Sequence, residues 1–124
     1  DLERVGDICY QMSVSIDRKE EKKIWFSAEQ REQLFELFAL VEGALAATTE
    51  NLNNEYDKIE LDKAYNRERD INEKRDRIKK AHFQNIEKAE YGFQNGMIYN
   101  DLFSSLEKIG DHVINVNEAV AGKI

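Results

Sequence analysis

Proline is absent from the 124 residues of this chain, and only six residues are glycine. These two residues interrupt helices most often, so the chain contains little that would break one. Hydrophobic residues make up 41% of the chain and charged residues 35%, which leaves enough apolar material for a core. We therefore predict an all-α protein, and this length corresponds to a single domain spanning residues 1–124.

Cysteine occurs once, as Cys9. A single cysteine excludes an internal disulfide and a CxxC metal site, and it is typical of a reducing compartment. Because Cys9 lies on an apolar stripe of the first predicted helix, we expect a small buried side chain there.

Long hydrophobic runs and an excess of basic residues are also missing. No apolar run approaches the ~20 residues that span a bilayer, so we expect this piece to be soluble. The net charge is −7 and the pI is near 4.9. This balance argues against a nucleic-acid partner, because nucleic-acid affinity depends on basic patches.

The spacing of apolar residues predicts four helices. The first runs from residue 1 to about 19–23, the second from about 27 to 52, the third from about 55 to 89, and the fourth from about 97 to 121. Residues 91–96 contain two glycines and are predicted to close the third helix. Short connections make neighbouring helices antiparallel, so we expect an antiparallel up-down bundle.

The second helix carries local signals at both ends. Ser27 and Gln30 have the S-x-x-Q spacing of a capping box, and Phe26 is placed as a hydrophobic staple. Residues 51–54 are predicted to form the turn that follows.

The phrase that opens the chain returns near its end. Residues 2–7 read LERVGD, and residues 106–112 read LEKIGDH. A glycine inside a helix costs about 1 kcal/mol relative to alanine. Gly6 and Gly110 are therefore predicted to lie where another group approaches the backbone.

Each of these glycines is bracketed by two carboxylates four residues apart, Glu3 with Asp7 and Glu107 with Asp111. Residues at this spacing lie one above the other on a helix. The second pair lies roughly opposite the apolar stripe of its helix, so we expect it at the surface or at a seam between helices. Either a solvated face or a ligand pair fits this spacing.

The third helix is the most charged segment. Glu68, Arg75 and His82 share or border its inward side, where charged groups must be paired or face a polar site. Glu68, Asn72 and Asp76 form a ladder of oxygen-bearing side chains at i, i+4 and i+8.

Folding the third helix against the fourth, about a turn near Gly92, predicts how the ladder and the carboxylate pair meet. Asn72 or the residue after it is placed opposite Asp111, and Asp76 or the residue after it is placed opposite Glu107. We therefore expect the ladder and the pair to share one site.

In these phrases the chain resembles the PhoU-like domains, regulators of bacterial phosphate uptake built from three-helix repeats with an E(D)xxxD motif. The likeness rests on residues 2–7, on ERDINEKRDRIKKAH at 68–82 and on residues 96–122. It is closest to the C-terminal cytoplasmic domain of bacterial sodium/phosphate cotransporter proteins. The resemblance implies one complete three-helix repeat at residues 27–122, preceded at residues 1–23 by the last helix of another.

The resemblance also implies a metal site, because the E(D)xxxD carboxylates bind metal clusters in proteins of the PhoU type. The implied and candidate ligands are Glu107, Asp111, Glu3, Asp7, Asn72 and Asp76. Their carboxylate and amide oxygens are hard ligands, suited to Fe, Mn, Mg or Ca.

The function implied is that of a non-catalytic regulatory domain of a sodium-dependent phosphate transporter. Such a domain would lie on the cytoplasmic side of the membrane and contact the transmembrane part of the same protein. We expect Tyr10, Phe103 and Ile114, beside the carboxylates, to belong to the contact surface. Self-association is also expected, because Tyr10 and Val14 give the first helix a second apolar edge.

Two other functions stay open. A structural or oligomerisation bundle needs only the amphipathic helices, and a carboxylate metalloenzyme needs a buried acid cluster with an open position. The sequence has no Gly-rich phosphate loop and no nucleophile motif such as G-x-S-x-G, so we predict no enzymatic activity.

Overall fold

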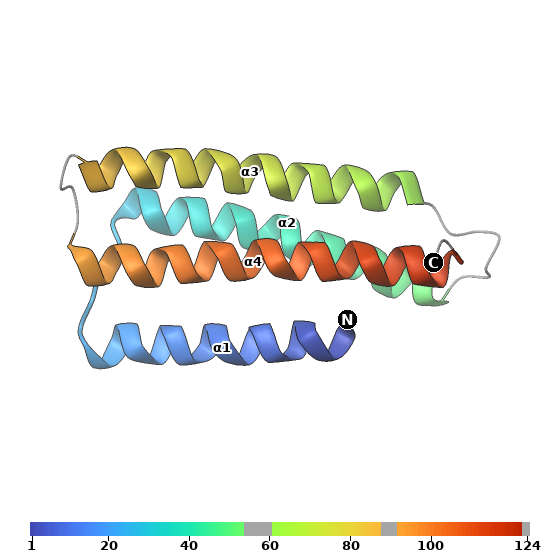
Figure 1. Ribbon diagram of the computed structural model, residues 1–124, viewed down its shortest axis with the longest axis horizontal. Coiled ribbons are helices and arrows are strands. Elements are labelled where there is room, and N and C mark those ends of the chain that lie inside the picture. The colour runs from blue at the N-terminus through green and yellow to red at the C-terminus, as the bar shows by residue number, and fades with distance from the viewer. Residues whose placement is uncertain (54–60, 88–91, 123–124) are drawn as a thin grey trace.

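The computed structural model describes residues 1–53, 61–87 and 92–122. These residues form four helices and no strand, which confirms the predicted all-α architecture (Figure 1). The helices are α1 (Leu2–Glu21), α2 (Ala28–Asn53), α3 (Leu61–Glu87) and α4 (Phe93–Val120). The parts of the predicted third helix at residues 55–60 and 88–89 lie outside the described residues.

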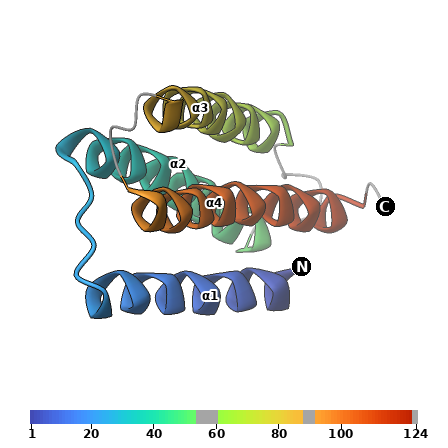
Figure 2. The ribbon, with the colours of Figure 1, turned by 60° about the vertical axis from the view of Figure 1, so that its left-hand side comes forward.

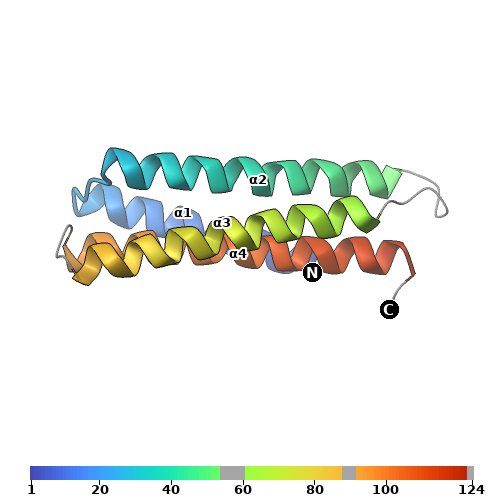
Figure 3. The ribbon, with the colours of Figure 1, turned by 90° about the horizontal axis from the view of Figure 1, so that it is seen from above.

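Helix α4 is the centre of the arrangement. It packs against the other three helices, α2 packs against α3, and α1 contacts chiefly α4. Figures 1 and 2 both show α1 on the far side of α4 from α3. Consecutive helices run in opposite directions along the bundle, as Figures 1 and 3 show, so the up-down order is also as predicted.

The central position of α4 explains why its buried surface is wider than one stripe. Tyr99, Phe103 and Ile114 are buried in addition to the apolar stripe of this helix. The stripe consists of Ile98, Leu102, Leu106, Ile109, Val113 and Val116. The expectation that Phe103 and Ile114 belong to an exposed contact surface is therefore wrong. These two side chains lie in the core because helices cover α4 on more than one side.

The capping box at the start of α2 is confirmed. The Ser27 backbone N–H donates to Gln30 Oε1 at 2.9 Å, and the Gln30 backbone N–H donates to Ser27 Oγ at 3.1 Å. Phe26, the predicted staple residue, is buried. Its ring lies edge-on to that of Tyr99, with centroids 5.5 Å apart, so it joins the start of α2 to α4.

One predicted turn and one predicted helix start are wrong. Helix α2 ends at Asn53, close to the predicted end, but residues 51–53 of the predicted turn are helical. Helix α4 begins at Phe93, about four residues earlier than expected, and Gly92 is its N-cap. The first turn of α4 is held by Asn95, whose Nδ2 donates to the Trp25 carbonyl at 2.8 Å and whose Oδ1 accepts from Gln30 Nε2 at 2.7 Å. These tertiary bonds offset the weak helix propensity of the glycines.

Cys9 is exposed, so its predicted burial is wrong. Helix α1 buries Ile8 and Met12. Cys9 instead lines an apolar groove between α1 and α2, together with Ile16 and Phe38. The stripe of α1 is only partly covered because α1 contacts chiefly α4.

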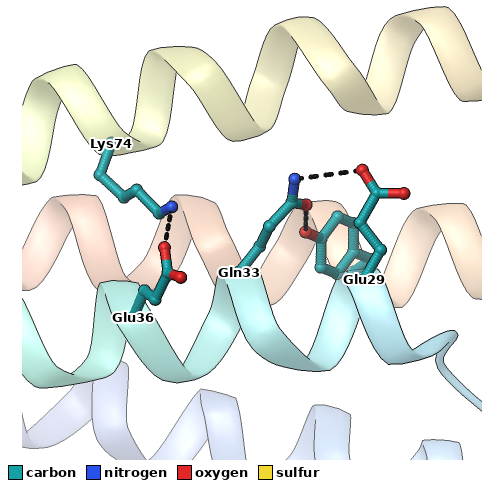
Figure 4. Close-up of polar contacts among 5 residues, drawn as sticks. Glu29, Gln33, Glu36 and Lys74 are labelled. Carbon is teal, nitrogen blue, oxygen red and sulfur yellow. Dashed lines mark hydrogen bonds and ion pairs between the residues drawn. The ribbon is translucent and has the colours of Figure 1, made fainter.

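Polar side chains, buried and exposed, also join the helices. Near the far end of α2, Asn51 Nδ2 donates to Asn117 Oδ1 at 2.8 Å, and Asn117 Nδ2 donates to Thr48 Oγ1 at 2.8 Å. Nearer its start, Tyr99 Oη donates to Gln33 Oε1 at 2.6 Å, and Figure 4 shows Lys74 of α3 reaching Glu36 of α2. Directional bonds of this kind fix the register that apolar contacts alone leave free.

None of the helices described here has a stretch long and apolar enough to cross a lipid bilayer.

Candidate functional site

The second glycine phrase lies where α4 meets α3. Gly110 is buried, and a Cβ placed on it would lie 3.2 Å from Cδ1 and 3.3 Å from Cγ2 of Ile71. The close approach predicted at Gly110 is confirmed, and the approaching group is a core side chain of α3. This contact brings the two helices together beside the carboxylate pair.

Glu107 and Asp111 are both partly buried at this seam. Arg75 of α3 reaches across, and its Nη1 lies 2.9 Å from Glu107 Oε1. The Nε of the same guanidinium donates to Asp76 Oδ1 at 2.8 Å. The expectation that a charged residue on the inward side of α3 must be paired is confirmed for Arg75.

The seam carries more negative than positive charge. The pKa of Glu68 is raised by burial and then by the neighbouring carboxylates Asp111, Glu118 and Glu107. The pKa of Glu107 is also raised, by burial and by its charge interaction and hydrogen bond with Asp111, although Arg75 acts in the opposite direction. The positive charge of Arg75 therefore does not fully compensate the negative charge of these carboxylates.

The ladder on α3 does not enter the seam as a unit. Glu68 is partly buried beside the α4 carboxylates, whereas Asp76 is exposed. The Oδ1 of Asn72 is buried and has no hydrogen-bond partner among the described residues. Arg75, rather than Asp76 or the residue after it, contacts Glu107. The predicted pairing of α3 with α4 therefore differs from the observed pairing by one or two residues. A small error in the assumed position of the turn is enough to produce a shift of this size.

Sequence reasoning missed Glu118 as a member of this group. Its Oε2 accepts a hydrogen bond from Tyr65 Oη at 3.2 Å, and its charge acts on Glu68. The signal was present, because Glu118 follows Glu107 by 11 residues and so lies on the same face of α4.

The first glycine phrase is not part of this site. Glu3 and Asp7 are exposed on α1, and a Cβ on Gly6 would meet nothing within 4 Å. The close approach predicted at Gly6 is therefore not made within the described part of the chain. Just before the start of α1, Asp1 Oδ1 lies 2.8 Å from Nδ1 of His112 in α4.

The seam as arranged does not fit a closed metal site. Among residues 1–53, 61–87 and 92–122, no three His, Cys, Asp or Glu side chains converge closely enough to hold a metal ion. The Arg75 cation already lies against Glu107, one of the two central candidate ligands. Hard oxygen ligands are present, but a metal would have to replace the guanidinium.

His82 is buried among aromatic rings, with centroids 5.4 Å from Tyr99 and 5.5 Å from Phe103. Burial lowers the pKa of this imidazole. The folded state therefore favours the neutral ring, and the stability associated with it is lost as the pH falls below about 6.5.

Comparison with known protein families, with curated proteins and with solved structures gave no match to this chain.

The raised pKa of Glu68 predicts a pH-dependent effect of Glu68→Gln. A raised pKa means that ionised Glu68 destabilises the folded state at neutral pH, and that this cost disappears as the pH falls through the folded-state pKa. We expect the variant to be more stable than the parent at pH 7 by a few tenths of a kcal/mol, after allowance for solvent screening. The difference should shrink towards pH 4.5. Urea unfolding at several pH values measures it.

His82 titrates in both proteins, so the difference between them isolates Glu68. Glu73→Gln is the matched control, because Glu73 is exposed on the same helix. A gain at neutral pH that is equal for both variants would show that the effect comes from net charge and not from the seam.

Proposed function

We propose that this chain is a non-catalytic regulatory domain of a sodium-dependent phosphate transporter, acting through contact with the transmembrane part of the same protein on the cytoplasmic side. The observation that supports this most is the repeated glycine phrase with its carboxylate pairs. Its second copy places Glu107 and Asp111 at a helix seam with uncompensated negative charge. A seam of this kind would respond to its surroundings, because its charge balance depends on how Arg75, and Arg67 near Glu68, are placed against the carboxylates.

Regulation requires that the domain bind two states of the transporter with different affinity, since equal affinity shifts no equilibrium. The proposed contact surface comprises the α1 carboxylates Glu3 and Asp7 and the exposed Tyr10. The seam would be coupled to this surface through α4, which contacts both α1 and α3. Self-association through the open side of α1 belongs to the same proposal.

The proposal is tested by phosphate uptake in cells that carry the full transporter. Glu107→Gln with Asp111→Asn should abolish the difference in uptake rate between phosphate-replete and phosphate-starved cells, at unchanged amounts of protein in the membrane. Glu73→Gln with Asp101→Asn is the control, because both residues are exposed and outside the seam. If the seam variant responds to starvation like the parent, the bundle is a scaffold and the regulatory role is refuted.

A bound hard cation at Glu107 and Asp111 is a secondary proposal, which rests on the hard oxygen ligands of this carboxylate pair. It requires Arg75 to leave the seam. A ligand that binds only the folded state must raise its stability. A rise in melting temperature with millimolar Mn²⁺ that disappears in Glu107→Gln would support it, and an unchanged melting temperature would end it.

A further inference from the structure

Four large apolar side chains are exposed at one end of the bundle. They are Trp25, Phe83, Phe93 and Met97, which are 78%, 53%, 81% and 48% exposed. Trp25 lies between α1 and α2, Phe83 lies near the end of α3, and the other two lie in the first turns of α4. All three places are at the end where α1 and α3 finish and α4 begins, on the left in Figures 1 and 3. We call these four residues the aromatic tip.

The aromatic tip is attached to the folded bundle. The Trp25 carbonyl accepts a hydrogen bond from Asn95 Nδ2, and the neighbouring Phe26 is buried against Tyr99. The chain at Trp25 is therefore fixed to the bundle, and its ring is exposed in this fixed position. Placing several large apolar side chains in water is unfavourable, and a group of them marks an interaction site.

The segments that bear the tip are basic in an acidic protein. Residues 18–33, 77–87 and 92–100, which include the start of α2 at the same end, contain eight lysines and arginines and five glutamates, a net charge of +3 with His82 neutral. The whole chain has a net charge of −7, so the remaining residues carry −10. The end of the bundle that bears the tip is therefore net positive in an acidic protein.

Lysines lie beside two rings of the tip. Lys19 Nζ is 5.5 Å from the centroid of Trp25, and Lys79 Nζ is 5.9 Å from that of Phe83. Lys19 Nζ is also 5.1 Å from the centroid of the neighbouring buried ring, Phe26. Aromatic rings with flanking lysines are the composition that stabilises proteins at the headgroup region of a bilayer. There the rings enter the acyl boundary and the ammonium groups meet lipid phosphates.

Two surface hollows of the described residues lie along α2 and between α1 and α2, and none of the four tip residues lines either of them. The tip residues are instead exposed side chains at the end of the bundle, and rings exposed in this way can enter the acyl boundary of a bilayer. We propose that the aromatic tip docks this protein on a bilayer that contains anionic phospholipid, and this inference does not depend on the proposed transporter.

Trp25 is the only tryptophan of the chain, so it reports docking directly. We expect its fluorescence to shift to shorter wavelength with phosphatidylglycerol-containing vesicles at low salt, and brominated lipid to quench it. Pure phosphatidylcholine vesicles should produce much weaker binding, and added salt should reverse the binding. Co-sedimentation with the vesicles gives the partition coefficient independently.

Two pairs of variants separate the contributions. Phe83→Ser with Phe93→Ser should lower the partition coefficient about tenfold, whereas Phe35→Ser with Leu52→Ser, which are 70% and 49% exposed on α2 away from the tip, should leave it unchanged. Lys22→Glu with Lys23→Glu should lower it more than tenfold. Arg4→Glu with Lys108→Glu makes the same change in net charge elsewhere and should have a small effect. All of these residues are exposed, and circular dichroism checks that each variant folds.

Three results would overturn the proposal. The first is the absence of a fluorescence shift with anionic vesicles at low salt. The second is equal binding of tip variants and controls. The third is a shift that depends on protein concentration without vesicles, because the tip would then contact the acidic remainder of a second copy.

Discussion

Replacing Asn117 with alanine should destabilise the protein by about 2–3 kcal/mol. Asn117 is 2% exposed, and its amide makes three hydrogen bonds, to Asn51, to Thr48 and to the Val113 carbonyl. The truncation leaves Asn51 Nδ2 buried without its acceptor, and a buried donor without a partner is costly. Urea unfolding monitored by circular dichroism measures the loss.

A second variant distinguishes hydrogen bonding from packing. Asn51→Leu with Asn117→Leu removes both amides and keeps the branched side-chain shape, and the Thr48 hydroxyl still donates to the Ala44 carbonyl. We therefore expect stability much closer to that of the parent. Thr49→Ala is the control, because its hydroxyl bonds only to the Leu45 carbonyl on the exposed side of α2. If the double leucine variant loses as much as Asn117→Ala, the unpaired amide does not explain the effect, and the native packing and hydrogen bonds of this pair do.

The two glycine phrases should respond oppositely to alanine. At Gly6 the added methyl group meets open space, and we expect a gain of about 0.5–1 kcal/mol, because alanine favours helix over glycine. At Gly110 the methyl group would meet Ile71, which is 1% exposed and confined by the core. We expect Gly110→Ala to destabilise the protein by about 1–2 kcal/mol, since the overpacking exceeds the helix propensity gained.

Gly43→Ala provides the internal comparison in the same thermal or urea unfolding experiment. Its added methyl group would meet only Nη1 of Arg67, the end of a flexible exposed side chain that can move aside. We expect a change near zero or a small gain. Equal stabilisation at Gly6 and Gly110 would mean that α3 and α4 are not held together tightly at Ile71.

Part of the candidate site could be predicted from the sequence. The phrase around Gly110 indicated a close approach to the backbone, and the position of Glu107 and Asp111 opposite the apolar stripe placed both either at the surface or at a helix seam. The inward position of Arg75 indicated that it must be paired, although not with which carboxylate. The inclusion of Glu118 and the exclusion of Asp76 depend on how α3 is rotated against α4. A small rotation of one helix against the other leaves the apolar periodicity of both sequences unchanged, so the sequence pattern does not reveal it.

The sequence by itself determined the four helices and the capping box at Ser27, because periodicity and capping arise from residues within a few positions of one another. Only the tertiary structure decided which helix faces are covered. Cys9 is exposed because α1 packs chiefly on α4, and α4 begins at Phe93 because Asn95 bonds to Gln30, 65 residues away. Contacts at such separations are set by the packing of whole helices, and no local pattern encodes them.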